Sequence, residues 1–194
     1  MRGKIKILKT KENIKSPYIQ PFSVFYEEDG KQKRWDCIKT HDSVACILYH
    51  TEKKALVLVK QFRPAVYMNA HESDGFTYEM CAGILDKNES EEQTMREEIL
   101  EECGYDVSLS SLERLFTFYT GVGFSGSKQT LFFASINESM KKNSGGGVHN
   151  EQIEIFYLPV SQAKEFMHDE SKPKTGITMF AIMWLFERYK FEAF

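Results

Sequence analysis

Cysteine and histidine are scarce in this chain of 194 residues. The four cysteines stand at positions 37, 46, 81 and 103, and no two of them form a C-x-x-C pair. Because disulfide frameworks are typical of small, loop-rich, secreted chains, we expect four buried free thiols. The five histidines show none of the spacings of zinc ligands, which argues against a zinc site.

Long apolar runs and an excess of one charge are absent as well. The longest apolar stretch, residues 177–186, is too short to cross a bilayer, and the basic N-terminus lacks an apolar run of signal-peptide length. A net charge of −3 without a basic stripe argues against nucleic-acid binding. A hydrophobic fraction of 42% argues against a disordered chain. The composition predicts a soluble, cytoplasmic globular protein with neither a membrane nor a nucleic acid as partner.

Many short apolar segments separated by turn residues predict an α/β fold, a mixed sheet covered by helices. Residues 22–28 and 33–40 flank Asp29-Gly30, a dipeptide typical of a hairpin turn. Further strands are predicted at 43–49, 55–62, 77–81, 112–119, 129–136 and 152–158, and helices at 161–168 and 176–190.

The best-defined helix is predicted to begin after Ser90 and to end at Gly104. Gln93 follows Ser90 at the spacing of a capping box. Met95 and Ile99 recur at helical spacing, and Gly104 suits the left-handed residue that ends many helices. This helix also holds the densest acidic charge in the sequence.

Residues 89–102 contain seven glutamates and one arginine, a local charge of −6 in a chain whose total is only −3. Glu98, Glu101 and Glu102 are spaced i, i+3 and i+4, so they share one helix face. Like charges at that spacing repel, and a bound cation would stabilise them; the alternative is an ordinary solvated face. Carboxylate oxygens favour Mg²⁺ or Mn²⁺, and protein-bound Mg²⁺ is commonly shared with substrate phosphates. The cluster therefore predicts hydrolysis or transfer at a phosphate.

Residues 83–105 resemble the Nudix box, G-x5-E-x7-R-E-U-x-E-E-x-G-U, in which U is a bulky apolar residue. The matching residues are Gly83, Glu89, Glu98, Ile99, Glu101, Glu102, Gly104 and Tyr105. One position departs, because Glu97 stands where the family has an arginine and Arg96 comes one residue early. A local bulge in the helix would be needed to bring Arg96 into place.

The resemblance to the Nudix family extends over most of the chain. Segments that look like those of Nudix pyrophosphatases acting on UDP-sugars or ADP-ribose are 16–18, 35–36, 39–44, 56–67, 102–105 and 125–130. The resemblance implies a Nudix α/β/α sandwich with a mixed sheet, formed by a hydrolase domain at residues 43–194. Residues 1–42 are expected to form an N-terminal β-hairpin extension for dimerisation and nucleobase contact in a homodimer.

The resemblance also implies which residues bind metal. It places Mg²⁺, or Mn²⁺, at Glu98, Glu101 and Glu102, with the backbone carbonyl of Ala82 as a further ligand. Glu101 and Glu102 are expected to be catalytic through the metal that they hold.

A general base for the attacking water is expected from a loop late in the chain. Glu151 matches the family's position, and Glu154 is the alternative. The glycine-rich residues 145–147 would then be a flexible tether that lets Glu151 swing toward bound substrate. Against this stands the possibility that Glu151 is an ordinary loop carboxylate.

Three further residues are candidates for substrate binding. Arg63 can hold a phosphate through two parallel hydrogen bonds, although a structural ion pair is the alternative. Trp35 resembles the family's base-stacking tryptophan, which can act in the partner subunit's site; packing is the alternative. Glu79 lies close before the Nudix box and is a weaker candidate for the same site.

The function implied is Mg²⁺-dependent hydrolysis of the diphosphate bond of nucleoside diphosphate sugars. UDP-glucose, cut to UMP and glucose 1-phosphate, is the first choice of substrate. ADP-ribose, cut to AMP and ribose 5-phosphate, is the alternative, because the shared segments do not separate uracil from adenine. The departure at Glu97 leaves open a non-catalytic module that binds a nucleotide sugar.

Overall fold

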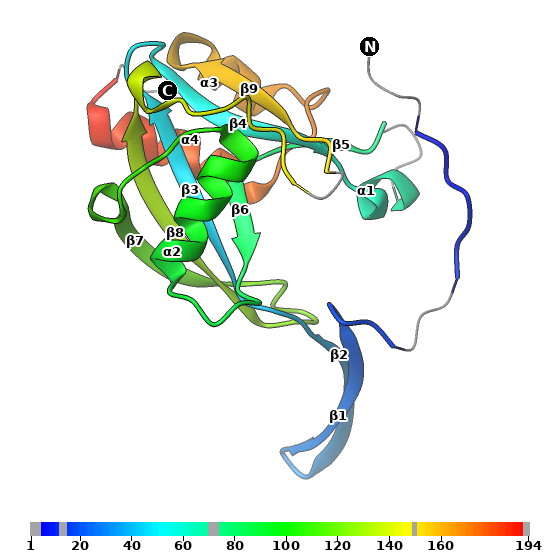
Figure 1. Ribbon diagram of the computed structural model, residues 1–194. Coiled ribbons are helices and arrows are strands. Elements are labelled where there is room, and N and C mark those ends of the chain that lie inside the picture. Colours follow the sequence, from blue (N-terminus) through cyan, green and yellow to red (C-terminus); the bar gives the residue numbers. More distant parts are fainter. Residues whose placement is uncertain (1–4, 12–14, 70–73, 149–150, 192–194) are drawn as a thin grey trace. The chain divides into compact units, whose positions relative to one another are not determined.

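The computed structural model describes residues 5–11, 15–69, 74–148 and 151–191. Its strands are β1 (Gln20–Glu28), β2 (Lys31–Lys39), β3 (Ser43–His50), β4 (Ala55–Phe62), β5 (Phe76–Glu79), β6 (Cys81–Ile84), β7 (Glu113–Thr120), β8 (Ser127–Ile136) and β9 (Glu154–Pro159). Its helices are α1 (Pro64–Asn69), α2 (Glu91–Glu98), α3 (Val160–His168) and α4 (Gly176–Tyr189), and a π-helical turn, Ile99–Cys103, continues α2 (Figure 1).

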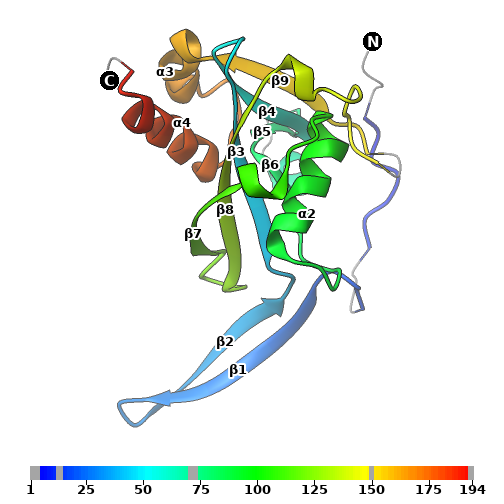
Figure 2. The same cartoon turned by 60° about the vertical axis from the view of Figure 1, so that its left-hand side comes forward.

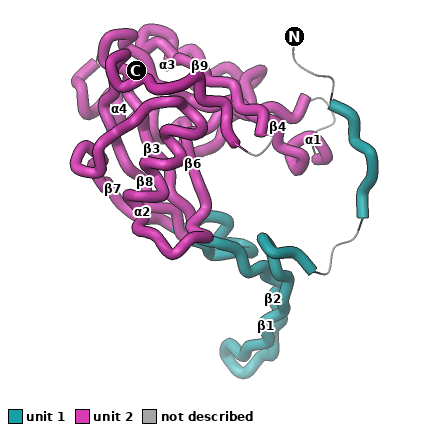
Figure 3. Tube along the Cα trace, in the orientation of Figure 1, with its two compact units in different colours: residues 1–41, 119–127 teal, residues 42–118, 128–194 magenta. Residues whose placement is uncertain are grey.

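The chain divides into two compact units (Figure 3). The smaller consists of residues 1–41 and 119–127, and the larger of residues 42–118 and 128–194. The smaller unit is built on the predicted hairpin, in which β1 and β2 pair from Gln20↔Lys39 to Glu28↔Lys31.

A seven-stranded mixed sheet forms the larger unit: five strands follow the order β5-β4-β3-β8-β7, while β6 pairs with β3 and β9 pairs with β4. The central strand β3 runs parallel to β8 and antiparallel to β4. Strand β6 pairs with β3 over Ser43 to Cys46, whereas β4 pairs with β3 over Leu48 to His50. The two strands thus share one edge of β3, and β6 brings the start of the Nudix box to the middle of the sheet.

Side chains of β3 alternate between two apolar cores, because successive residues of a strand point to different faces. The first core joins Cys46 and Leu48 to Met95 of α2. The second joins Ile47 to Leu185 of α4, together with residues of α3. Accordingly, α2 covers one face of the sheet while α3 and α4 cover the other (Figure 2). The predicted α/β/α sandwich and the N-terminal hairpin are confirmed.

One local prediction was wrong, and one short helix was missed. The single strand predicted at 77–81 is two strands, β5 and β6, separated by the buried Met80. The chain changes neighbours there, because β5 pairs with β4 and β6 with β3. The short helix α1 was not predicted; Pro64 opens it, at a helical position where proline's missing N–H costs nothing.

All four cysteines are free thiols, as expected, although Cys37 is only half-buried. Among the described residues, no helix has the length and apolar character needed to cross a membrane.

Candidate active site

Helix α2 begins as its sequence predicts. The Ser90 hydroxyl oxygen accepts the N–H of Gln93 at 3.1 Å, which satisfies one of the unpaired donors of the first turn. The second half of the capping box is absent, because the Gln93 side chain donates instead to Glu97 at 2.8 Å.

The helix ends in a π-turn over Ile99–Cys103, closed by Gly104 in the left-handed conformation with φ 77°. A π-turn contains one more residue than an α-turn and is frequent at functional sites. The spacing of Glu98, Glu101 and Glu102 is therefore not that of a regular α-helix. Glu102 is only 6% exposed, and its carboxylate accepts the N–H of Ala82 at 3.1 Å.

Glu98 lies directly over the backbone of β6. A Cβ atom added to Gly83 would overlap the Glu98 carboxylate, so the opening glycine of the box is required by this close approach. Glu98 and Glu102 lie on successive turns of the helix, and both side chains reach the backbone of Ala82 and Gly83. Of the predicted ligands, Glu98 and Glu102 are thus brought to the backbone of residues 82–83, where Glu102 contacts the N–H of Ala82; Glu101 is close enough for its charge to raise the pKa of Glu98.

Burial is the main cause that raises the pKa of both glutamates. The pKa of Glu98 rises to about 7, with further contributions from the charges of Glu101 and Glu151. The pKa of Glu102 rises to about 8, and the charges of Glu98 and Glu151 add to the effect. One buried and one half-buried carboxylate, both costly to ionise, form a set of hard oxygen donors, which fits a divalent cation such as Mg²⁺ or Mn²⁺.

Cys81 is a neighbour of Glu102 that the sequence did not suggest. Burial raises the pKa of this thiol well above its usual value, so it stays protonated. It forms a hydrogen bond with Glu102, which lowers the pKa of that carboxyl and partly offsets its burial. The only signal in the sequence is that Cys81 stands next to Ala82 in the same strand.

The general-base candidate Glu151 lies near the helix glutamates, since its charge raises the pKa of Glu98, Glu102 and also Arg63. Its carboxylate accepts the N–H of Val148 at 3.1 Å. The alternative base, Glu154, is the first residue of β9 and faces Lys60 in the strand register.

Arg63 and Glu79 form a two-pronged ion pair. Nε of Arg63 donates to Glu79 at 2.7 Å, and Nη2 donates at 2.6 Å. The Thr77 hydroxyl donates to the same carboxylate, which fixes its orientation. The structural ion pair foreseen for Arg63 is thus present, and Arg63 is also within electrostatic reach of Glu102 and Glu151.

Arg96 does not brace the glutamate cluster. Its guanidinium donates to the carbonyl of Val107 at 3.0 Å and to Asp106 at 2.9 Å. The π-turn is a local bulge of the predicted kind, but it begins after Arg96 and leaves this side chain directed elsewhere. Glu97 pairs with Lys87 at 2.9 Å.

Trp35 lies in the smaller unit. Its indole N–H donates to the carbonyl of Gly123 at 2.7 Å, and 53% of the residue is exposed. The neighbouring backbone of Ile38 also donates to the carbonyl of Phe124 at 2.8 Å. The loop at 121–126 is therefore attached to β2, and the indole ring has one edge fixed.

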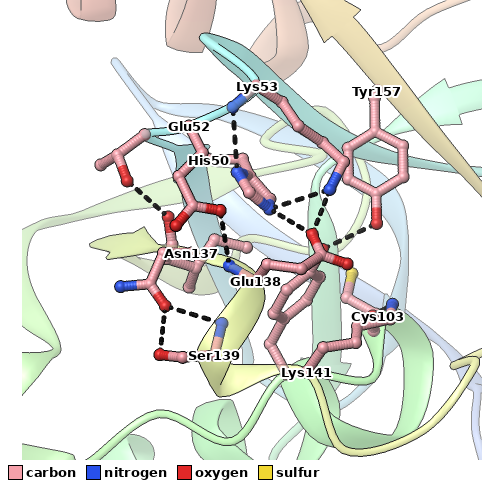
Figure 4. A network of polar contacts seen from close by, with 12 residues as sticks. His50, Glu52, Lys53, Cys103, Asn137, Glu138, Ser139, Lys141 and Tyr157 are labelled. Atoms are coloured by element: carbon pink, nitrogen blue, oxygen red, sulfur yellow. Dashed lines mark hydrogen bonds and ion pairs between the residues drawn. The ribbon is translucent and has the colours of Figure 1, made fainter.

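A second acidic group lies around His50 (Figure 4). Among the described residues, it is the one set of three potential metal ligands, with Glu52 and Glu138, whose atoms lie within 4.8 Å of one another. The ammonium group of Lys53 forms an ion pair with Glu138 and lies 3.2 Å from the buried imidazole. Because the Lys53 ammonium already provides a positive charge here, we interpret His50, Glu52, Lys53 and Glu138 as a structural network.

The fold and the glutamate site define the class of protein. Residues 39–176 match the NUDIX domain, and the chain belongs to the Nudix family. It is 39% identical over 198 residues to uridine diphosphate glucose pyrophosphatase NUDT14 of Bos taurus, covering 88% of this chain and 89% of the relative. The Mus musculus protein of the same name is 37% identical over 200 residues, covering 89% and 90%. GDP-mannose pyrophosphatase of Pectobacterium atrosepticum is 40% identical over 138 residues, covering 71% and 69%.

Proposed function

We propose that this protein hydrolyses the diphosphate bond of nucleoside diphosphate sugars, with UDP-glucose cut to UMP and glucose 1-phosphate. The observation that carries the proposal is the pair of glutamates, the half-buried Glu98 and the buried Glu102, held against the backbone of residues 82–83. Support comes from the two relatives named uridine diphosphate glucose pyrophosphatase, which align with 88% and 89% of this chain.

Glu98, Glu101, Glu102 and the backbone carbonyl of Ala82 would hold Mg²⁺, with Mn²⁺ as the alternative. When bound, the ion supplies positive charge to the diphosphate and lowers the pKa of a water ligand. The burial of Glu102, which is 6% exposed, keeps competing water away from its oxygens. Cys81 and Ala82 orient Glu102 by donating to its carboxylate.

Two residues outside the helix contribute to the reaction. Glu151 accepts the proton of the attacking water at its carboxylate, and its proximity to the charges of Glu98 and Glu102 supports this role over Glu154. Glu79 occupies Nε and one terminal nitrogen of Arg63, so the other terminal nitrogen can donate to a phosphate oxygen. Glu79 then acts on the substrate indirectly, by orienting the Arg63 guanidinium.

Residues 1–42 are proposed to mediate a homodimer and to contact the nucleobase through Trp35. A two-stranded hairpin is marginally stable alone, and β1 exposes apolar side chains such as Phe22 and Phe25. A second copy of the chain would cover them. The free thiols support a cytoplasmic location, where cysteines stay reduced.

The GDP-mannose pyrophosphatase relative favours a second candidate substrate, GDP-mannose. Stacking on an indole is tolerant of the base, so Trp35 does not separate uracil, guanine and adenine. ADP-ribose therefore remains a third candidate substrate.

A substrate panel tests the proposal. UDP-glucose, GDP-mannose, ADP-ribose and nucleoside triphosphates are incubated with the protein and Mg²⁺ or Mn²⁺, and kcat/KM is measured for each. We expect the highest kcat/KM for UDP-glucose. A preference for another compound would replace the substrate, and thermal stabilisation by UDP-glucose without turnover would indicate a binding module instead of an enzyme.

A further inference from the structure

The glycine-rich segment before Glu151 is bound to the backbone of the metal-ligand turn. The N–H of Gly146 donates to the carbonyl of Glu102 at 2.9 Å, and the N–H of Gly147 donates to the carbonyl of Glu101 at 3.0 Å. The last carbonyls of a helix have no partner within the helix. Here they are satisfied by the segment that leads to the general-base candidate.

Neighbouring contacts strengthen this attachment. The Lys141 ammonium donates to the carbonyl of Cys103 at 2.7 Å, and the N–H of Lys142 donates to the carbonyl of Gly104 at 2.8 Å. Residues 141–147 therefore follow the end of the helix closely, and the free tether predicted from the glycines is replaced by a docked segment.

Glycine is required at both ends of the triplet. Gly145 and Gly147 have φ values of 65° and 84°, which L side chains rarely adopt. A Cβ on Gly145 would overlap the carbonyl oxygen of Glu102, and a Cβ on Gly147 would come within 2.7 Å of both Cβ and Oε2 of Glu151. The first contact is to the metal-ligand turn and the second is to the base itself.

Two hydrogen bonds with Val148 hold Glu151 on the far side of the triplet. The N–H of Glu151 donates to the carbonyl of Val148 at 3.0 Å, and its carboxylate accepts the N–H of the same residue at 3.1 Å. The N–H of Ile153 donates back to the carbonyl of Gly146 at 3.1 Å. Hydrogen bonds on both sides of the triplet therefore connect Glu151 to the carbonyls of Glu101 and Glu102.

We propose that residues 145–147 are a backbone strap that positions Glu151 relative to the turn bearing Glu101 and Glu102. This inference rests on the proposed function. Gly145 sets the distance to the turn, and Gly147 sets the direction in which Glu151 leaves the strap. The strap then fixes the position of the base relative to the metal ligands, so that Glu151 is already placed when an ion binds to the glutamates.

Substitutions at the two ends of the strap are expected to have different kinetic effects. Gly147→Ala displaces mainly Glu151, with a looser contact at the Ile153 side chain, and we expect kcat to fall about tenfold or more, while the Mg²⁺ concentration for half-maximal rate stays within about twofold. Gly145→Ala displaces the Glu102 carbonyl, and we expect that Mg²⁺ concentration to rise roughly tenfold. A loss of overall stability would not separate the two quantities in this way.

Gly126→Ala is the matched control. Gly126 also has a positive φ of 62°, and a Cβ there would meet no atom within 4 Å, so the variant carries the same backbone strain without a displaced neighbour. We expect its kcat and Mg²⁺ dependence to equal those of the wild type. If Gly147→Ala and Gly126→Ala behave alike while Glu151→Gln is strongly impaired, the strap is refuted and the proposed function stands. If Glu151→Gln retains full activity, the proposed base is refuted instead.

Hydrogen exchange of the wild-type protein tests the strap without any variant. The amides of Gly146 and Gly147 are expected to exchange at least about tenfold more slowly than the amide of Gly123 in the exposed loop. Equal exchange rates at these glycines would show an undocked segment and overturn the inference, whatever the substrate proves to be.

Discussion

Two groups of carboxylates in the larger unit have their pKa values shifted in different directions. Lys53 and His50 lower the pKa of Glu138 by donating to its carboxylate. Burial raises the pKa of Glu98 and Glu102, and no lysine or arginine among the described residues forms an ion pair with either. A nearby cation thus favours the ionised form of a carboxylate: the group around His50 has one in Lys53, and the helix glutamates are proposed to take one from solution.

Removing a helix glutamate is expected to have the largest effect. Glu102→Gln takes away a metal-ligand oxygen, and we expect kcat/KM for UDP-glucose to fall by about two to three orders of magnitude in the presence of Mg²⁺. Steady-state kinetics measure the loss. Equal rates for the variant and the wild type would remove Glu102 from the metal site.

The next effect concerns pH and stability without metal. The folded protein holds a proton on Glu102 up to pH about 8, whereas the unfolded chain releases it above its ordinary pKa of 4.5. Stability from this raised pKa is complete below the unfolded value and is lost as pH rises through the folded one. In chelator, we expect a loss on the order of 4 kcal/mol between about pH 5 and 8.5, or roughly 8–16 °C in Tm.

Thermal melting at several pH values measures this loss, and two additions sharpen it. Mg²⁺ should restore stability most at the alkaline end, because it binds the ionised carboxylates. Glu102→Gln should weaken the dependence, since an amide does not titrate in this range, and should leave the smaller part that comes from the raised pKa of Glu98. A wild-type Tm that is constant from pH 5 to 8.5 in chelator would contradict the raised pKa.

A smaller effect is expected at the ion pair beside the site. Arg63→Lys replaces a forked guanidinium by a single ammonium, and we expect kcat/KM to fall roughly tenfold, mostly through KM. Arg188→Lys is the control, because Arg188 forms a similar two-pronged pair with Glu113 at 2.9 and 2.7 Å. Equal losses in the two variants would mean that Arg63 has no role beyond its ion pair.

The smallest effect is expected in the group that has its own cation. Glu138→Gln should leave kcat/KM and its Mg²⁺ dependence within about twofold of the wild type, because exposed ion pairs contribute little. The same kinetic assay checks this. A marked change in the Mg²⁺ dependence would show that the His50 group takes part in metal binding after all.

Much of the fold could be predicted because its signals are local. Asp29-Gly30 marks the hairpin, the apolar residues 55–62 mark β4 to the residue, and Ser90 and Gly104 mark the ends of the acidic helix. The division of 77–81 into two strands could not be predicted, because it depends on which strands lie alongside.

The candidate site could be predicted only in part, because some of its features are local in the sequence and others are not. The spacing of Glu98, Glu101 and Glu102 is visible in the sequence, but the π-turn within it depends on partners about 40 residues away. The pairing of Arg63 with Glu79 comes from the neighbouring strands β4 and β5. No local pattern contains either contact.

The parallel pairing of β3 with β8 has a consequence for how the protein folds. Ser43 and Gln129, which face each other across these strands, are 86 residues apart in the chain. Strands β4 to β7 and the glutamate helix all lie within that loop, so its closure entropy must be overcome before the sandwich can form. A peptide of residues 81–105 would contain the complete Nudix box and yet remain unfolded, because the burial that shapes Glu98 and Glu102 comes from the rest of the sheet. We expect the metal site to mature late, in the same cooperative step that joins the two halves of the sheet.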